Sequence, residues 1–155
     1  MTTEQTTPDS GNAVLDVTAD AVAAIFEEEN LEYRVEGDGD ARIVRSGFIN
    51  AAIVVAQDTD HLVFEALWRG QIPRDAAAQL LFTINEHNQT HFAPTLRFFE
   101  QDNHLAVSAI RSMDITHGAS FNQLGAFIVS SIEATLEAFA FLGASFPAAV
   151  TWEEQ

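Results

Sequence analysis

Two histidines have the residue type and spacing that come closest to a metal site in this sequence. His87 and His91 lie four residues apart, which places both imidazoles on one face of an α-helix, as in paired zinc ligands. Three residues could supply a third ligand: Glu86, Asp114 and His117. Asn88 and Pro94 favour a helix that ends near His91, which would separate the two imidazoles. We therefore predict no metal site and interpret the segment as a polar helix end, with His87 and His91 as the sole metal candidates.

Serine, histidine and aspartate occur in a combination that could support hydrolysis. The candidates are Ser108, Ser112 and Ser120 as nucleophiles, His104 or His117 as base, and Asp114. No G-x-S-x-G elbow surrounds any of these serines. Five histidines and 23 acidic residues in a chain of 155 will place some such trio close together by chance. We predict no catalytic residue and a protein that is not an enzyme.

The charged residues exclude several further functions. All seven cationic side chains are arginine, and the sequence contains neither lysine nor cysteine. This removes phosphate-loop and Schiff-base lysines, disulfides, thiolate zinc sites and thiol nucleophiles, and we expect no cofactor. The net charge of −16 repels phosphate backbones and anionic lipids. We therefore expect neither nucleic acid nor a membrane as a partner.

The length and the N-terminus predict one domain. A chain of 155 residues fits the ~100 to 200 residues of an average domain. We expect a disordered acidic tail over 1–13, a single domain over 14–150 and a short C-terminal tail over 151–155. The first twelve residues lack a basic start and an apolar run, and no segment reaches ~18 consecutive apolar residues. We therefore expect a cytoplasmic protein.

Apolar periodicity and turn residues predict eight secondary-structure elements. In chain order they are a helix over 18–30, strands over 31–35, 42–57 and 61–69, a helix over 73–91, strands over 96–98 and 105–109, and a helix over 120–142. Thr18 is the expected N-cap of the first helix, and Ser120 with Gln123 has the spacing of a capping box. The strand connections are too short for a parallel crossover. The predicted fold class is α+β, with an antiparallel sheet and the order α-β-β-β-α-β-β-α.

The same patterns predict turns and a core. The stretch 42–57 is long for one strand, and Ser46-Gly47 indicates a bulge or bend within it. Asp102-Asn103 tolerates the positive φ of a tight hairpin. The expected core residues are Phe64, Trp68, Leu81, Ile84, Phe98, Val107, Leu124 and Ile128.

Three elements carry more apolar surface than the predicted elements can readily cover. The helix over 120–142 has its polar residues in a narrow stripe and apolar residues over a much wider arc. The strands near 51–56 and 62–68 are apolar on both faces. We therefore expect a homodimer whose contact is apolar at its centre. The expected interface residues are Phe48, Ile53, Val63, Leu67, Ile132 and Phe139.

Several segments together resemble a known family. They are Thr18 with the helix after it, Leu31-Glu32-Tyr33, Ser46-Gly47-Phe48 leading into 53–56, 64–68 with Pro73, the pairs Ile84-Asn85 and His87-Asn88, and Gly118-Ala119-Ser120 with Gln123-Leu124. Over 17–142 the chain resembles the YbjN family of bacterial sensory transduction regulators. Its element order is also similar to that of the type III secretion chaperones. The first resemblance implies an α+β fold and a regulatory function without a reaction, and the second implies a homodimer.

Two classes of function remain after these exclusions. The favoured one is a non-enzymatic protein-interaction module, chaperone-like or regulatory, that presents apolar surface to an unidentified protein partner. The alternative is a small-molecule or metal sensor domain that binds its ligand between the sheet and the helices. An exposed apolar surface would favour the first class, and a closed pocket with convergent polar groups would favour the second.

Overall fold

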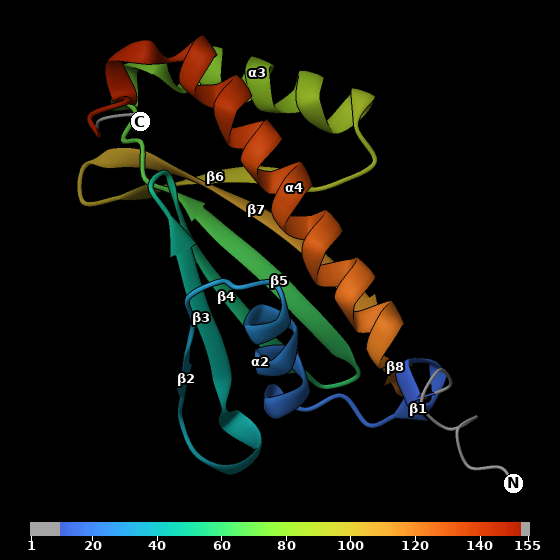
Figure 1. The fold of residues 1–155 in the computed structure, drawn as a ribbon. Coiled ribbons are helices and arrows are strands. Elements are labelled where there is room, and N and C mark those ends of the chain that lie inside the picture. The colour runs from blue at the N-terminus through green and yellow to red at the C-terminus, as the bar shows by residue number, and fades with distance from the viewer. Residues whose placement is uncertain (1–9, 153–155) are drawn as a thin grey trace, which may run out of the picture.

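An antiparallel sheet is the framework of the protein (Figure 1). The computed structural model describes residues 10–152, and within this range six strands pair in the order β2-β3-β4-β5-β7-β6. Their bounds are Arg34–Glu36 for β2, Ile43–Phe48 for β3, Ala51–Asp58 for β4, His61–Trp68 for β5, Thr95–Gln101 for β6 and His104–Asp114 for β7. Every neighbouring pair is antiparallel. Together with the helices, this sheet confirms the predicted α+β class.

Helices and short elements complete the described part of the chain. The α-helices are α2 (Ala19–Glu28), α3 (Ala77–Thr90) and α4 (Phe121–Ser145). The short elements are the 3-10 helices η2 (Ser10–Asn12), η3 (Gly39–Ala41), η4 (Arg74–Ala76) and η5 (Pro147–Ala149), and the two-stranded sheet of β1 (Val14–Leu15) and β8 (Ala119–Ser120). The predicted N-terminal tail therefore contains η2 at its end. Its first nine residues, and 153–155 of the predicted C-terminal tail, lie outside the described residues.

The local signals at helix starts and in one hairpin are confirmed. The Thr18 hydroxyl accepts a hydrogen bond from the backbone N–H of Ala21 at 3.1 Å. Ser120 and Gln123 form the complete capping box, with distances of 3.0 and 2.8 Å between the paired atoms. Asp102 and Asn103 adopt φ angles of 51° and 70° in the turn between β6 and β7. Each of these depends on residues within a few positions of one another, and a sequence pattern reports such contacts directly.

The stretch predicted as one strand over 42–57 is instead a hairpin of β3 and β4. The chain reverses at Ile49 and Asn50, two residues after the expected bend, and Phe48 pairs with Ala51 across the turn. The guanidinium of Arg69 donates to the carbonyl oxygens of Phe48 and Ala51, both at 3.2 Å. This turn has no glycine or proline, and it is held by a side chain from outside the hairpin. Local sequence signals therefore do not reveal it, and the sheet gains a strand over the predicted order.

The core lies between the sheet and the described helices. Figure 1 shows α2 and α4 crossing the same side of the sheet, with α3 beside the end of α4 and near β6. Side chains alternate along β5: Leu62, Phe64, Ala66 and Trp68 are at most 2% exposed, whereas the residues between them are half-buried. This alternation is typical of a sheet with one covered face.

Two of the predicted core residues are not fully buried. Phe64, Trp68, Ile84, Val107, Leu124 and Ile128 are buried as predicted. Leu81 is 49% exposed, because the buried stripe of α3 contains Leu80 and Ile84 and leaves Leu81 to one side. Phe98 is half-buried and packs against the core from its edge, because β6 is the last strand of the sheet.

The apolar composition of α4 follows from its central position. By length and hydropathy alone, this 25-residue helix could cross a membrane. Nine of its residues are buried against the rest of the chain. Arg111 of β7 also donates to the hydroxyl groups of Ser130 and Ser131 on α4, at 2.6 and 3.1 Å. The core of the described domain therefore accounts for this apolar helix.

A pair of identical substitutions tests these assignments. Leu124→Ala removes a side chain that is 2% exposed and should lower the free energy of unfolding by about 2 to 5 kcal/mol, because the cavity left behind cannot fully collapse. Leu81→Ala removes the same atoms from an exposed position and should change it by less than about 0.5 kcal/mol. Urea unfolding followed by circular dichroism measures both. Equal losses in the two variants would show that the burial of α3 and α4 is wrongly assigned.

Candidate functional site

One face of the sheet carries apolar side chains that do not belong to the core. Val63 and Leu67 alternate with the buried residues of β5, are half-buried, and do not pack against the core cluster. Strand register places Ala56 beside Val63 and Ala52 beside Leu67. We call this surface, opposite the helices, the outer face. Its central apolar residues are Ala52, Val54, Ala56, Val63, Leu67 and Ile110.

Arginines flank the apolar centre of the outer face. Arg97 forms an ion pair with Glu65 at 3.0 Å. At the other side, Arg34 and Arg45 are cross-strand neighbours and share the carboxylate of Glu36, at 3.1 and 2.7 Å. By register Asp58 and Asp114 lie on the same face beside His61, so three arginines offset four carboxylates there, in a chain whose net charge is −16. The outer face therefore differs in charge from the protein as a whole.

The predicted interface residues divide between this face and the core. Val63 and Leu67 lie on the outer face, as an interface requires. Ile53, Ile132 and Phe139 are 1%, 7% and 1% exposed and belong to the core, so their assignment to an interface is corrected. The sheet of the same chain covers the wide apolar arc of α4. Phe48 is half-buried against the core, next to the turn between β3 and β4.

The geometry of His87 and His91 does not suit a shared metal ion. The helix continues to Thr90, so the imidazoles are not separated as predicted but stack, with 4.2 Å between ring centroids and 11° between ring planes. A metal would have to lie in the plane of both rings, about 2.0 Å from a nitrogen of each, whereas these rings face one another. His87 Nε2 lies 3.2 Å from the Pro94 carbonyl oxygen, and His91 Nδ1 lies 3.1 Å from that of His87. Residues 10–152 contain no group of three histidine, aspartate or glutamate side chains that could hold a metal ion.

His87 is instead a buried structural side chain. Its residue is 4% exposed, and burial lowers the pKa of its imidazole below the ordinary value. The hydrogen bond to Pro94 and the charge of Glu137 act in the opposite direction, and His91 adds to the lowering. Phe141 of α4 also stacks on the ring of His87, with centroids 6.4 Å apart. His87 thus joins α3 to α4 in its neutral form.

Asn88 has a role that sequence reasoning missed. Its side-chain amide donates to the Leu96 carbonyl oxygen and its oxygen accepts from the Leu96 N–H, both at 2.9 Å. A side chain of α3 therefore pairs with the outer edge of β6 as a neighbouring strand would. The partner lies eight residues away across Pro94, so no local capping pattern reports this pair. The only sequence signal was the His87-Asn88 pair within the family resemblance.

Three of the candidates for hydrolysis, Ser108, Ser120 and Asp114, have structural partners. Ser120 is the N-cap of α4, and Ser108 accepts from Arg97 at 3.1 Å. The Asp114 carboxylate accepts from the hydroxyl and the backbone N–H of Thr116, and these bonds lower its pKa. These contacts explain the three side chains without a reaction.

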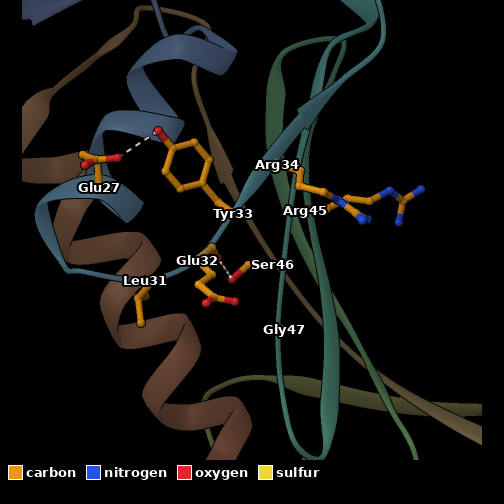
Figure 2. A pocket seen from close by; sticks show the side chains of 8 residues that line it. All are labelled: Glu27, Leu31, Glu32, Tyr33, Arg34, Arg45, Ser46 and Gly47. Atoms are coloured by element: carbon orange, nitrogen blue, oxygen red, sulfur yellow. Dashed lines mark hydrogen bonds between the residues drawn. The ribbon is translucent and has the colours of Figure 1, made fainter.

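An open groove of about 590 Å³ lies between the end of α2 and the hairpin of β2 and β3. Figure 2 shows the side chains that line it. Tyr33 donates to Glu27 at 3.0 Å, a bond that raises the pKa of the Tyr33 hydroxyl, and the hydroxyl of Ser46 donates to the Glu32 carbonyl at 2.7 Å. The side chains of Arg34 and Arg45 point away from Tyr33 (Figure 2). The lining residues are Glu27, Leu31, Glu32, Tyr33, Arg34, Arg45, Ser46 and Gly47. The polar groups here pair with one another and do not converge on a common point.

Asn88→Ala tests the contact at the sheet edge. The change removes both hydrogen bonds to Leu96 and should lower the free energy of unfolding by about 1 to 3 kcal/mol. Asn85→Ala, at an exposed position on the same helix, is the matched control and should leave the free energy of unfolding unchanged or raise it by a few tenths of a kcal/mol, because alanine has the higher helix propensity. Urea unfolding measures both, and equal changes in the two variants would show that the contact with Leu96 contributes no stability.

The lowered pKa of His87 predicts a loss of stability in acid. Below about pH 6.5 the unfolded chain binds a proton at this position that the folded chain resists, so the free energy of unfolding falls as the pH falls. His87→Gln cannot titrate and should flatten this dependence between about pH 7 and about pH 5. The exposed His117→Gln should keep the wild-type slope. An unchanged slope in His87→Gln would contradict the prediction.

The fold is shared with two solved structures. The crystal structure of "YbjN, a putative transcription regulator from E. coli" matches with a TM-score of 0.71 and 12% identity, over 86% of this chain and 96% of that one. "An uncharacterized protein from Methanothermobacter thermautotrophicus" matches with a TM-score of 0.53 and 14% identity, over 84% of this chain and 99% of that one. At these identities the similarity shows a shared fold alone. A search of the curated proteins found no similar sequence.

The sequence also matches a family profile over most of its length. The family is YbjN, described as "Putative bacterial sensory transduction regulator", and the match covers residues 18–144. This range extends from the N-cap of α2 nearly to the end of α4. The likeness to type III secretion chaperones stays a prediction. The chain belongs to the YbjN family.

Proposed function

We propose that this protein is a non-enzymatic protein-interaction module, regulatory or chaperone-like, that binds its partner through the outer face of the sheet. The observation that carries the proposal is the apolar centre of that face, which the core does not use. Cross-strand pairs join its residues into one surface over β4, β5 and β7. Apolar surface of this kind, flanked by polar groups, is typical of a protein contact.

The first partner we propose is a second copy of the same chain. Two molecules of net charge −16 repel one another. The helices α2, α3 and α4 contain six acidic residues and no arginine, and Glu27 and Glu28 are exposed at the end of α2. Glu133 and Glu137 of α4 are also exposed. The strands of the outer face carry three arginines and four carboxylates, so contact between two outer faces brings together little like charge. A two-fold arrangement of sheet on sheet would bury the apolar centres together.

A ligand sensor is the alternative, and one cavity supports it. About 380 Å³ lies between α2 and the adjacent strands. Arg42 and Asp20, which line it, form an ion pair at 2.6 Å. The strongest polar groups of this cavity therefore satisfy each other, and we favour the interaction module. A cytoplasmic location without nucleic-acid or membrane partners fits the acidic charge of the chain.

Sedimentation equilibrium of the wild type and two charge variants tests the proposal. The wild type should have the mass of a dimer at micromolar concentration, and moderate salt should strengthen association by screening the repulsion. Leu67→Glu places a charge in the apolar centre of the outer face and should give a monomer. Ala126→Glu adds the same charge to an exposed position of α4 and should leave the dimer intact.

The outcomes separate the two parts of the proposal. A wild type that is monomeric under every condition would reject self-association and favour the sensor alternative. A dimer that persists in Leu67→Glu would move the contact away from the outer face. Circular dichroism of both variants controls for folding.

A further inference from the structure

A hollow at the end of α4 has features of a binding site that are independent of the proposed function. Its volume is about 540 Å³, within the ~300 to 1,000 Å³ of small-molecule sites. It lies where the last turns of α4 and η5 meet the turn between β3 and β4. The lining residues are Asn50, Phe139, Ala140, Gly143, Ala144, Pro147, Val150 and Trp152. Apart from Asn50 and the indole N–H of Trp152, their side chains are apolar.

One tryptophan that lines this hollow and a second that packs against it hold donors without acceptors. Trp152 lines it and packs edge-on against Trp68, with 6.1 Å between ring centroids and 88° between ring planes. The indole Nε1–H groups of both are buried, and neither finds an acceptor within residues 10–152. Buried donors are normally paired, and leaving one unpaired costs about 1 to 3 kcal/mol. Two adjacent exceptions beside one hollow indicate a function for these groups beyond packing.

Trp152 can change its position more readily than Trp68. Trp68 is 1% exposed and is fixed by its place in β5. Trp152 follows η5, and the last backbone hydrogen bond of the described chain ends at Val150, whose N–H donates to the Pro147 carbonyl at 3.2 Å. The packing against Trp68 therefore holds the Trp152 side chain.

We propose that this hollow binds a small neutral molecule with an apolar body and one carbonyl oxygen. The carbonyl accepts the Nε1–H of Trp152 after the indole rotates, and the apolar body contacts Phe139, Ala140 and Val150. No cation lines the hollow in the described chain. The nearest turn is held by Arg69, whose guanidinium is already bonded to two backbone carbonyls. A carboxylate would therefore gain no ion pair here and would meet the repulsion of a strongly acidic protein.

The two tryptophans supply a reporter for the test, because they are the only two in the chain. Selectively excited tryptophan emission therefore reports on Trp152, which lines the hollow, and on Trp68, which packs against it. The probes are camphor, a compact neutral ketone; bornane, its hydrocarbon counterpart; and octanoate, an apolar carboxylate. Camphor should produce a saturable change in emission, and bornane and octanoate should produce a much weaker one. No saturable change with camphor up to its solubility would overturn the proposal.

Two variants locate the bound molecule. Trp152→Phe keeps an aromatic ring, removes the donor and leaves Trp68 as reporter, so camphor should bind about 10-fold more weakly, the worth of one hydrogen bond of about 1.4 kcal/mol. Ala144→Leu fills the hollow from an exposed position of α4 and should abolish the camphor-induced change in tryptophan emission. Ala126→Leu makes the same change elsewhere on α4 and should bind camphor as the wild type does. Wild-type affinity in Trp152→Phe would show that its indole is not the donor.

The result does not depend on self-association. Sedimentation of the wild type with and without camphor measures the mass separately. If a monomer binds camphor, self-association is rejected and the binding site in the hollow is supported. If the protein is a dimer and does not bind camphor, self-association is supported and the binding site is rejected.

Discussion

The packing of α4 against one face of the sheet is the contact on which the rest of the structure depends. Nine buried residues of this helix meet the sheet and the other helices, and Arg111 ties its middle to β7. Burial of this extent, at about 25 cal/mol per Å² of apolar surface, is the dominant favourable term in a domain of this size. Because α2 and α4 lie on the same side, the contact also decides which side of the sheet stays uncovered. The core and the outer face are thus two results of one arrangement.

How far the sequence predicts this fold depends on the range of each contact. The caps at Thr18 and Ser120 and the turn at Asp102 use residues within three positions, and their signals are correct. The turn at Ile49 is held by Arg69, which is far along the chain, so no local pattern reveals it. Leu81 belongs to an apolar run of α3, and periodicity over a short run does not fix the buried stripe to within one residue.

The candidate sites show the same limit. Val63 and Leu67 could be predicted, because a strand with apolar residues at both odd and even positions must place some of them on each face. Ile132 and Phe139 could not be separated from them, since a wide apolar arc on a helix looks the same whether its own sheet or a second chain covers it. The pairing of Trp68 with Trp152 joins opposite parts of the sequence and leaves no periodic signal.

The hydrogen bonds of Asn88 bear on how such molecules can assemble. An uncapped sheet can add strands at its ends, and each added chain then offers a new edge, which leads to open-ended fibres. Here the side chain of Asn88 already occupies both backbone groups of Leu96 at one end of the sheet, and the strand at the other end, β2, has three residues. Asn88 thus obstructs the addition of a strand beside β6, and β2 has few backbone groups with which an added strand could pair. Growth along the sheet is therefore disfavoured, and the outer face is the part of the sheet that the architecture leaves uncovered.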